Sequence, residues 1–196
     1  MYDSRWAMIV DEIPDEERKK LDKKIRGKKK EKFSLKWLVI ILLGVAIALS
    51  IKHFLIYKVK VSTGSMLPTI ENEEQILVTR VYNLKNLKRG DILVFESKEY
   101  EDIFIKRLIG LPGDNVKIMD GKVSVNGEQL DESYVKSHDD DYGDFIVPEG
   151  KYFFLGDNRP ESWDSRKWVN TYIDGSDIKG KAIMKVYPFR HFGKIE

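Results

Sequence analysis

Three short strand-like runs and two tight turns occupy residues Asn115–Leu130, which read NVKIMDGKVSVNGEQL. The turns are Asp120-Gly121 and Asn126-Gly127. Such pairs favour the two-residue turns that join antiparallel strands, because both turn positions take positive φ values. The stretch therefore predicts two consecutive hairpins and an antiparallel sheet. The expected strands are Asn115–Met119, Lys122–Val125 and Glu128–Leu130.

Turn signals and strand-like runs continue on both sides of this stretch. Pro112-Gly113-Asp114 and Pro148-Glu149-Gly150 contain residues that favour turns. Helical periodicity is weak over residues 58–196, and this part of the chain is long enough for one hydrophobic core. We therefore predict a mainly β domain of coiled antiparallel β-sheets over residues 58–196. Further strands are expected at Gln75–Val81, Asp91–Phe95, Ile103–Ile109, Lys151–Leu155 and Ala182–Val186.

An acidic stretch, DDDYGD, covers residues Asp139–Asp144. Carboxylate oxygens are ligands for calcium, but this spacing is not that of a calcium-binding loop. We expect an exposed loop here, with a calcium site as the alternative.

An uncharged apolar run of 15 residues extends from Trp37 to Ile51. The run resumes after Lys52-His53 and ends at Tyr57, giving 21 positions, close to the roughly 20 residues that a membrane-spanning helix needs. Trp37 and Tyr57 suit the two lipid–water interfaces. We therefore predict a single transmembrane anchor over residues 37–57. A buried helix of a soluble domain is the alternative, but such a helix would normally show a polar face.

A cleaved signal peptide is a second alternative for this segment. Ala46-Ile47-Ala48 matches the small-x-small pattern of a cleavage site, but it lies inside the apolar run rather than after it. The preceding leader of 36 residues is also long for a signal peptide. An uncleaved anchor is the favoured interpretation.

Charge is distributed unevenly along the chain. Residues 1–36 hold 12 Lys/Arg and 8 Asp/Glu, whereas residues 58–196 hold 21 and 24. A basic block beside an apolar segment is typical of the cytoplasmic flank of a membrane protein. The block lacks the interleaved aromatic residues of a nucleic-acid site, so we expect no nucleic-acid partner. The predicted organisation is a basic cytoplasmic leader at 1–36, the anchor at 37–57 and an extracytoplasmic domain at 58–196.

Cysteine is absent, which excludes disulfides, a thiol nucleophile and cysteine-ligated zinc. His53, His138 and His191 all lie in sequence contexts typical of surface residues, so they are poor candidates for a serine-activating base. A buried lysine can replace histidine in that role, because full burial lowers a lysine pKa by up to about 3–5 units. Strand alternation places Lys106 on the same face as Phe104 and Leu108, which is compatible with a buried amine, although a strand lysine taken alone is more often solvated; the sequence resemblance described next favours burial.

Four segments, in order along the chain, resemble the sequence boxes of the bacterial type I signal peptidase family, which are Ser-Lys dyad serine proteases. The order, the spacing and the preceding apolar run all match, and the resemblance covers residues 37–190 in a compact, Gram-positive-like form. The four segments are Ser62–Thr69, Gly90–Phe95, Ile105–Asp114 and Gly156–Arg166.

The resemblance implies roles for individual residues. Ser65 would be the nucleophile and Lys106 the general base, with the Ser162 hydroxyl orienting the Lys106 amine. The backbone N–H of Ser65 and the hydroxyl of Thr63 would bind the oxyanion. The resemblance also implies substrate pockets lined by Val61, Met66, Ile103 and Ile105, an exposed apolar rim at Met66-Leu67, and site-shaping polar residues at Asp157, Asp164 and Arg166.

The implied activity is removal of signal peptides from exported preproteins, by acyl-enzyme hydrolysis after a small-x-small site such as Ala-x-Ala. No metal or cofactor is expected. The expected partners are signal peptides and the lipid bilayer, near the export machinery, with the chain in the cell membrane and its catalytic domain extracytoplasmic. A peptide-binding β module without activity and a self-cleaving repressor are the rival interpretations. A literal Ser-x-x-Lys at Ser176–Lys179 lies in a polar turn and is not taken as a site.

Overall fold

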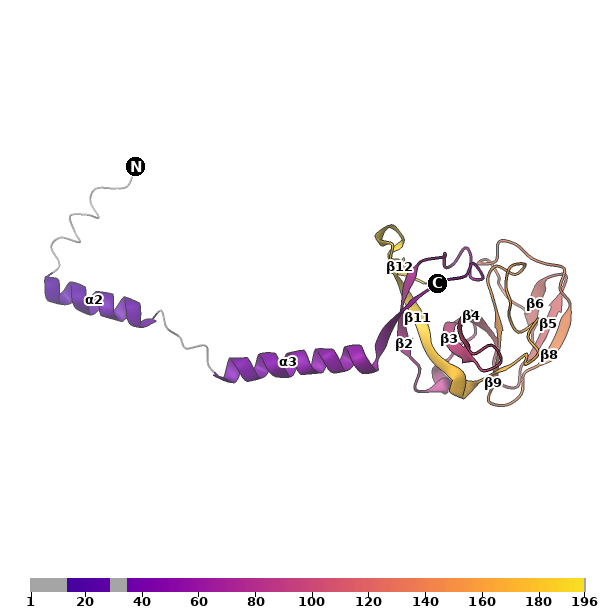
Figure 1. Cartoon of the computed structure of the whole chain (residues 1–196), viewed down its shortest axis with the longest axis horizontal. Coiled ribbons are helices and arrows are strands. Elements are labelled where there is room, and N and C mark those ends of the chain that lie inside the picture. The colour runs from indigo at the N-terminus through magenta and orange to yellow at the C-terminus, as the bar shows by residue number, and fades with distance from the viewer. Residues whose placement is uncertain (1–13, 29–34, 196) are drawn as a thin grey trace. The chain divides into compact units, whose positions relative to one another are not determined.

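The computed structural model describes residues 14–28 and 35–195. The chain divides into two compact units, Met1–Leu49 and Ser50–Glu196. The described part of the first unit is helical, and the second unit is built mainly of strands (Figure 1). Parts of the predicted leader, residues 1–13 and 29–34, lie outside the described residues.

Two helices precede the strands. Helix α2 (Asp15–Lys28) begins with three acidic residues, which complement the positive end of its dipole. Helix α3 (Leu35–Phe54) contains most of the apolar run. No helix among the described residues combines the length and the apolar character that crossing a membrane requires.

The predicted anchor also extended too far along the chain. Helix α3 ends at Phe54, and strand β1 (Ile56–Lys60) begins two residues later. Tyr57 lies opposite Val78 of strand β2 (Gln75–Arg80) and packs against the core of the strand unit. Long-range strand pairing therefore takes Ile56 and Tyr57 from the predicted helix, and a count of apolar residues cannot detect such pairing.

The strand unit contains two antiparallel sheets. The larger has eight strands in the order β1-β2-β11-β3-β4-β9-β10, with β12 paired to β11. The smaller has four, in the order β7-β6-β5-β8, and β5, β6 and β8 lie side by side in Figure 1. The remaining bounds are β3 (Ile92–Ser97), β4 (Asp102–Gly110), β5 (Asn115–Met119), β6 (Lys122–Val125), β7 (Glu128–Gln129), β8 (Gly143–Ile146), β9 (Lys151–Leu155), β10 (Ile173–Asp174), β11 (Ile178–Tyr187) and β12 (Gly193–Lys194), with short 3-10 turns at Leu84–Asn86, Gly175–Asp177 and Phe189–His191.

The two predicted hairpins are confirmed. All four turn residues have positive φ, namely 49° and 70° at Asp120-Gly121 and 53° and 87° at Asn126-Gly127. Strands β5, β6 and β9 have the predicted bounds.

The predicted acidic loop is present at residues 139–142, with Asp140 and Tyr142 exposed, but the prediction was wrong at the end of the segment and for two of its carboxylates. Gly143 and Asp144 belong to β8, which pairs with β5. The carboxylates of Asp139 and Asp141 accept hydrogen bonds from one guanidinium nitrogen of Arg166, at 2.5 and 2.7 Å. Strand pairing and a distant arginine, neither visible in the local sequence, hold this segment in place.

The two faces of β4 pack against different apolar clusters. Ile105 belongs to a cluster with Val61 and Met66, whereas Leu108 belongs to an aromatic cluster with Phe95 and Phe154. Strands β3 and β9 pair with β4 on its two edges. Side chains in the middle of β4 are therefore covered on both faces, whereas β9 pairs only from Arg107 onward, so residues 102–106 have a strand partner on one edge.

Gly121 offers a test of how the acidic segment is attached to the small sheet. A Cβ at Gly121 would overlap the backbone oxygen of Asp139, whereas a Cβ at Gly127 would meet nothing within 4 Å. Both glycines have positive φ, so alanine costs roughly 1–2 kcal/mol at either position. Measured by urea unfolding, the free energy of unfolding should fall by roughly 1–3 kcal/mol more in Gly121→Ala than in Gly127→Ala. Equal losses in the two variants would contradict the close approach.

Candidate active site

Ser65 and Lys106 line the same small cavity, whose volume is about 70 Å³. One wall is formed by residues 59–63 together with Ser65, and the other by residues 102–106 together with Val94. Ser65 is only 5% exposed and Lys106 only 2%. The fold thus brings a hydroxyl and an amine from separate segments into one largely buried space.

The Lys106 amine lies on the predicted face of β4. Its Nζ is 5.9 Å from the centre of the Phe104 ring, two residues earlier on the same strand. Burial lowers the pKa of the amine from 10.5 to about 8. A substantial fraction of Lys106 is therefore neutral in mildly alkaline solution and able to accept a proton.

Four charged groups face this amine and act on its pKa in opposite directions. The carboxylates of Asp164 and Asp157 raise the pKa, because they stabilise the ammonium form. The cations of Arg166 and Lys167 lower it. Burial is the largest influence, and so the net pKa is low.

The turn that carries Ser65 is anchored by Asn158. The backbone N–H of Asn158 donates to the carbonyl oxygen of Ser65, and its side-chain Nδ2 donates to the carbonyl oxygen of Gly64, both at 3.0 Å. The Thr63 hydroxyl lies 3.3 Å from the Ser65 hydroxyl. The predicted oxyanion group is thus adjacent to the predicted nucleophile.

Gly156 lies in close contact with the same turn. A Cβ at this position would overlap the Ser162 hydroxyl and approach the Ser65 carbonyl oxygen to 2.5 Å. The Gly156 backbone N–H donates to Asp164 at 3.0 Å. Only glycine allows this segment to pack between Ser65 and Ser162.

Asp157 forms a buried ion pair with Arg107, the neighbour of Lys106 in β4. Nε and one terminal nitrogen of the guanidinium donate to the two carboxylate oxygens, at 2.8 and 2.7 Å. The Thr69 hydroxyl also donates to Asp157, at 2.5 Å. This bidentate pair is further packed on the ring of Tyr134. Together with the Thr69 bond it connects β4, the Ser62–Thr69 segment and the Gly156–Arg166 segment.

Asp164 is fully buried and bound by Arg166. Burial raises the pKa of Asp164, but hydrogen bonds from Arg166 and its charge outweigh this effect and the net pKa is lowered. Arg166 also contacts the carboxylates of Asp139 and Asp141, so its charge is shared among three acids. Asp157, Asp164 and Arg166 therefore all lie close enough to act on the Lys106 amine, and none of them lines the cavity itself.

Ser162 is buried beside Asp164, but the predicted hydrogen bond to Lys106 is not formed. The Ser162 hydroxyl faces the Asp164 carboxylate and contributes to its low pKa. The two groups do not reach hydrogen-bond geometry, and the hydroxyl has no partner among the described residues. The Ser162 hydroxyl is therefore buried close to the site and beside Asp164, without a formed hydrogen bond among the described residues.

The predicted substrate residues divide into two groups. Val61 and Ile105 line the cavity and also pack in the core, while Ile103 lines it and is 50% exposed. Met66 is fully buried in the core and does not line this cavity, so the predicted exposed rim at Met66-Leu67 was wrong for Met66. Helical-type turns after Ser65 direct Met66 inward, which a sequence box cannot show.

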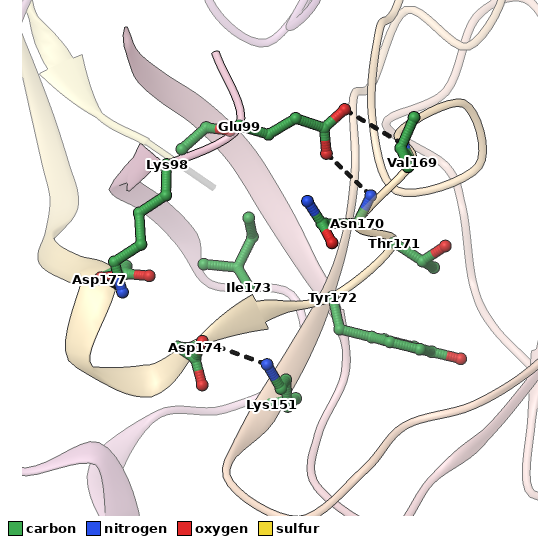
Figure 2. Close-up of a pocket in the computed structure, with 11 residues that line it drawn as sticks. Lys98, Glu99, Lys151, Val169, Asn170, Thr171, Tyr172, Ile173, Asp174 and Asp177 are labelled. Atoms are coloured by element: carbon green, nitrogen blue, oxygen red, sulfur yellow. Dashed lines mark hydrogen bonds and ion pairs between the residues drawn. The ribbon is translucent and has the colours of Figure 1, made fainter. Parts of the chain in front are cut away.

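A roomier cavity of about 430 Å³ contains none of the predicted site residues (Figure 2). Its charged groups are already paired, because Lys98 contacts Asp177 at 2.8 Å and Lys151 contacts Asp174 at 3.1 Å. The Glu99 carboxylate accepts two backbone N–H groups, as Figure 2 shows. This cavity offers no nucleophile with a neutral base.

One group among the described residues has the spacing of a metal site. Ligand atoms of Glu71, Glu74 and His191 lie within 4.8 Å of one another. The Lys185 ammonium lies 3.4 Å from a Glu74 oxygen, and its positive charge would repel a metal ion bound at these residues. None of these residues lines the cavity of Ser65 and Lys106.

Sequence reasoning did not assign roles to Arg107, Asn158, Gly156 or Lys167. All four lie within or beside the quoted boxes, which was the available signal. A charged residue in a strand or loop normally predicts solvent exposure, so the buried contacts of Arg107 could not be inferred from its type.

Comparison with known proteins places these observations in a family. The chain matches the family described as signal peptidase, peptidase S26, over residues 34–187. A signal peptidase I of Leptolyngbya laminosa is 36% identical, over 78% of this chain and 79% of that protein. One of Bacillus licheniformis is 34% identical, over 89% of this chain and 99% of that protein. Signal peptidase I S of Bacillus subtilis strain 168 is also 34% identical, over 84% and 95%. The chain therefore belongs to the signal peptidase family, peptidase S26, and is a serine protease of that family.

Proposed function

We propose that this protease removes N-terminal signal peptides from exported preproteins, with Ser65 as nucleophile and Lys106 as general base. The observation that carries the proposal is the buried Lys106 amine, with a pKa of about 8, in one cavity with the Ser65 hydroxyl. A serine hydroxyl becomes a nucleophile only when a nearby base removes its proton. A base whose pKa lies near the working pH does this efficiently.

The reaction proceeds in two stages. Ser65 Oγ attacks the scissile carbonyl carbon while neutral Lys106 takes the hydroxyl proton. The ammonium then gives this proton to the leaving amine, the peptide bond breaks and an acyl-enzyme remains. Water attacks the ester with Lys106 again as base, and the signal peptide leaves as a carboxylic acid while the Ser65 hydroxyl is restored.

Negative charge on the carbonyl oxygen needs donors during both stages. We assign the Ser65 backbone N–H and the Thr63 hydroxyl to this task, since Thr63 lies 3.3 Å from the Ser65 hydroxyl. Ser162 is assigned the role of orienting the Lys106 amine. Its hydroxyl is buried near the site and has no other partner among the described residues, and catalytic hydrogen bonds often shorten only when substrate binds.

The cavity favours an extended peptide with small side chains. Its walls come from the end of β1 and the start of β4, two separate backbone edges between which a peptide strand can lie. Val61 and Ile105 supply apolar surface, and the cavity volume of about 70 Å³ leaves room for small side chains only. We therefore assign alanine-sized residues to positions −1 and −3 of the substrate, which gives cleavage after Ala-x-Ala.

Helix α3 gives the chain a means of membrane attachment. Every side chain described for residues 35–50 is exposed, and most of them are apolar. Apolar side chains on all faces of a helix are stable only when lipid or protein covers them. We propose that α3 attaches the protease to the bilayer, near the export machinery. The proposed sidedness, with the basic leader cytoplasmic and the strand unit extracytoplasmic, rests on the charge pattern of the sequence and not on a helix of the structure.

The catalytic assignment predicts that two substitutions abolish cleavage. Ser65→Ala and Lys106→Ala should each reduce kcat by at least about 10³-fold on a purified preprotein with an Ala-x-Ala site, because the two groups act as a unit. Far-ultraviolet circular dichroism should confirm that both variants are folded.

A substrate with phenylalanine at −1 serves as the control for pocket size and should resist the wild-type enzyme. Near-normal turnover by either variant would refute the Ser65–Lys106 mechanism. Ready cleavage after phenylalanine would refute the small pocket.

The lowered pKa of Lys106 predicts how activity depends on pH. Below about 8 the amine is mostly ammonium and cannot accept the Ser65 proton, so kcat/KM should fall about tenfold per pH unit on the acidic side. Above about 8 the neutral amine predominates and the curve should level off. Initial rates across a pH series test this. If the acidic limb of the pH–rate profile were centred near pH 6.5, the ordinary pKa of histidine, a different residue would be the base.

The attachment proposal predicts that charge on α3 releases the chain from lipid. Leu42 and Leu43 are each 60% exposed, and lysine at the centre of a lipid-inserted helix costs roughly 3 kcal/mol per residue. The double variant Leu42→Lys, Leu43→Lys should lower liposome binding in a flotation assay by more than about tenfold. Leu21→Lys is the matched control, since Leu21 is 54% exposed on the polar helix α2.

The side of the membrane on which the strand unit lies is tested separately, by its accessibility to protease. Protease added to intact protoplasts should digest the strand unit and spare a tag at the N-terminus. Protection of the strand unit, or equal flotation of all variants, would contradict the proposed attachment.

A further inference from the structure

Lys167 folds back onto the loop that carries Ser162. Its ammonium donates a hydrogen bond to the Ser162 carbonyl oxygen at 3.1 Å. Its backbone N–H donates to the Asp164 carbonyl oxygen at 2.8 Å. A lysine side chain normally extends into water and gives up considerable rotamer freedom when it is held in this way. The two bonds fix residues 162–167 as one closed turn.

This turn forms a wall of the active site. The Ser162 side chain packs so closely on Gly156 that a Cβ there would overlap it, and Gly156 in turn contacts the Ser65 carbonyl oxygen. A shift of the Ser162 backbone therefore reaches the nucleophile turn through Gly156. The hydrogen bond from Lys167 to the Ser162 carbonyl oxygen restrains the Ser162 backbone against such a shift.

The charge of Lys167 is less compensated than that of its neighbours. Asp164 and Asp157 are bound by Arg166 and Arg107 respectively, and Arg166 shares its charge among three carboxylates. Among the described residues, no carboxylate forms an ion pair with Lys167, whose ammonium contacts a neutral carbonyl oxygen. Because no carboxylate in the described part of the chain offsets it, the charge of Lys167 disfavours protonation of the Lys106 amine.

We propose that Lys167 is a positioning residue for the Ser65–Lys106 pair, because its ammonium fixes the Ser162 turn, which packs on Gly156 and through Gly156 on the Ser65 turn. The charge of Lys167 also favours the neutral form of the Lys106 amine, although burial, Asp164, Arg166 and Asp157 all influence that amine more strongly. This inference rests on the proposed function for its catalytic meaning. Its physical content, an effect of Lys167 on the Lys106 amine, is independent of cleavage. Lys167 contacts a backbone oxygen rather than substrate, so its effect on turnover acts through Ser162 and Lys106.

Three substitutions separate the properties of Lys167. Lys167→Arg keeps both the charge and the donor, Lys167→Gln removes the charge and keeps a donor group, and Lys167→Met removes both. Lys98→Gln is the matched control, because it removes a lysine charge at the cavity of Figure 2 and Lys98 is not among the charges that act on Lys106.

The closing experiment measures the Lys106 amine directly. Full-length protein in detergent, carrying Ser65→Ala, is labelled with trace acetic anhydride across a pH series on both sides of about 8. Labelling of Lys106 is then quantified by mass spectrometry. We expect the pKa of Lys106 to rise by on the order of half a unit in Lys167→Gln and Lys167→Met, a size typical of one partly screened charge. Lys167→Arg and Lys98→Gln should leave it unchanged.

Kinetics in the Ser65 background provide the second readout. Below the midpoint of the pH profile, Lys167→Met should lose about threefold or more in kcat with KM nearly unchanged, because a half-unit pKa rise is a threefold loss of neutral amine. Lys167→Arg should keep kcat close to the wild-type value. Identical labelling curves for wild type, Lys167→Gln and Lys167→Met would overturn the inference. A labelling shift in the Ser65→Ala background, together with no preprotein cleavage by the chain that retains Ser65, would support the inference and refute the proposed function alone.

Discussion

The rest of the structure depends on the burial of one lysine amine in the interior of a β-sheet. Lys106 lies in β4, between β3 and β9, and its side chain faces Phe104 and the aromatic cluster rather than water. An ammonium is strongly disfavoured in such surroundings, whereas a neutral amine is tolerated. The same packing that gives the sheet a continuous core therefore also favours the neutral amine that the proposed mechanism requires of its base.

The proposed mechanism also requires the Ser65 turn to be held in place beside Lys106, and contacts from the Gly156–Arg166 segment restrain that turn. Asn158 binds the carbonyl oxygens of Gly64 and Ser65, and Asp157 joins Arg107 of the lysine strand to Thr69 of the nucleophile segment. Segments far apart in sequence are thus connected by short buried hydrogen bonds. A buried polar group that loses its partner costs free energy, so these hydrogen bonds resist any movement of Ser65 relative to Lys106.

The features predicted correctly from sequence are those that depend on local chemistry. The Asp120-Gly121 and Asn126-Gly127 turns follow from the need for positive φ, and the face of Lys106 follows from strand alternation. The errors involve distant partners. Tyr57 leaves the predicted helix because Val78 pairs with it, and Met66 is buried because it packs against core residues from other strands. The ion pairs of Arg166 with Asp139 and Asp141 likewise join residues more than twenty positions apart.

The charges around Lys106 show why burial rather than an ion pair sets its pKa. Two carboxylates favour the ammonium form and two cations oppose it, so their influences work against each other. The carboxylates are also engaged by Arg107 and Arg166, which reduces their pull on the Lys106 proton. Desolvation by the surrounding core remains as the largest influence. A single acid beside the amine would have fixed it as an ammonium; an arrangement of paired acids lets a polar, well-connected site retain a neutral lysine.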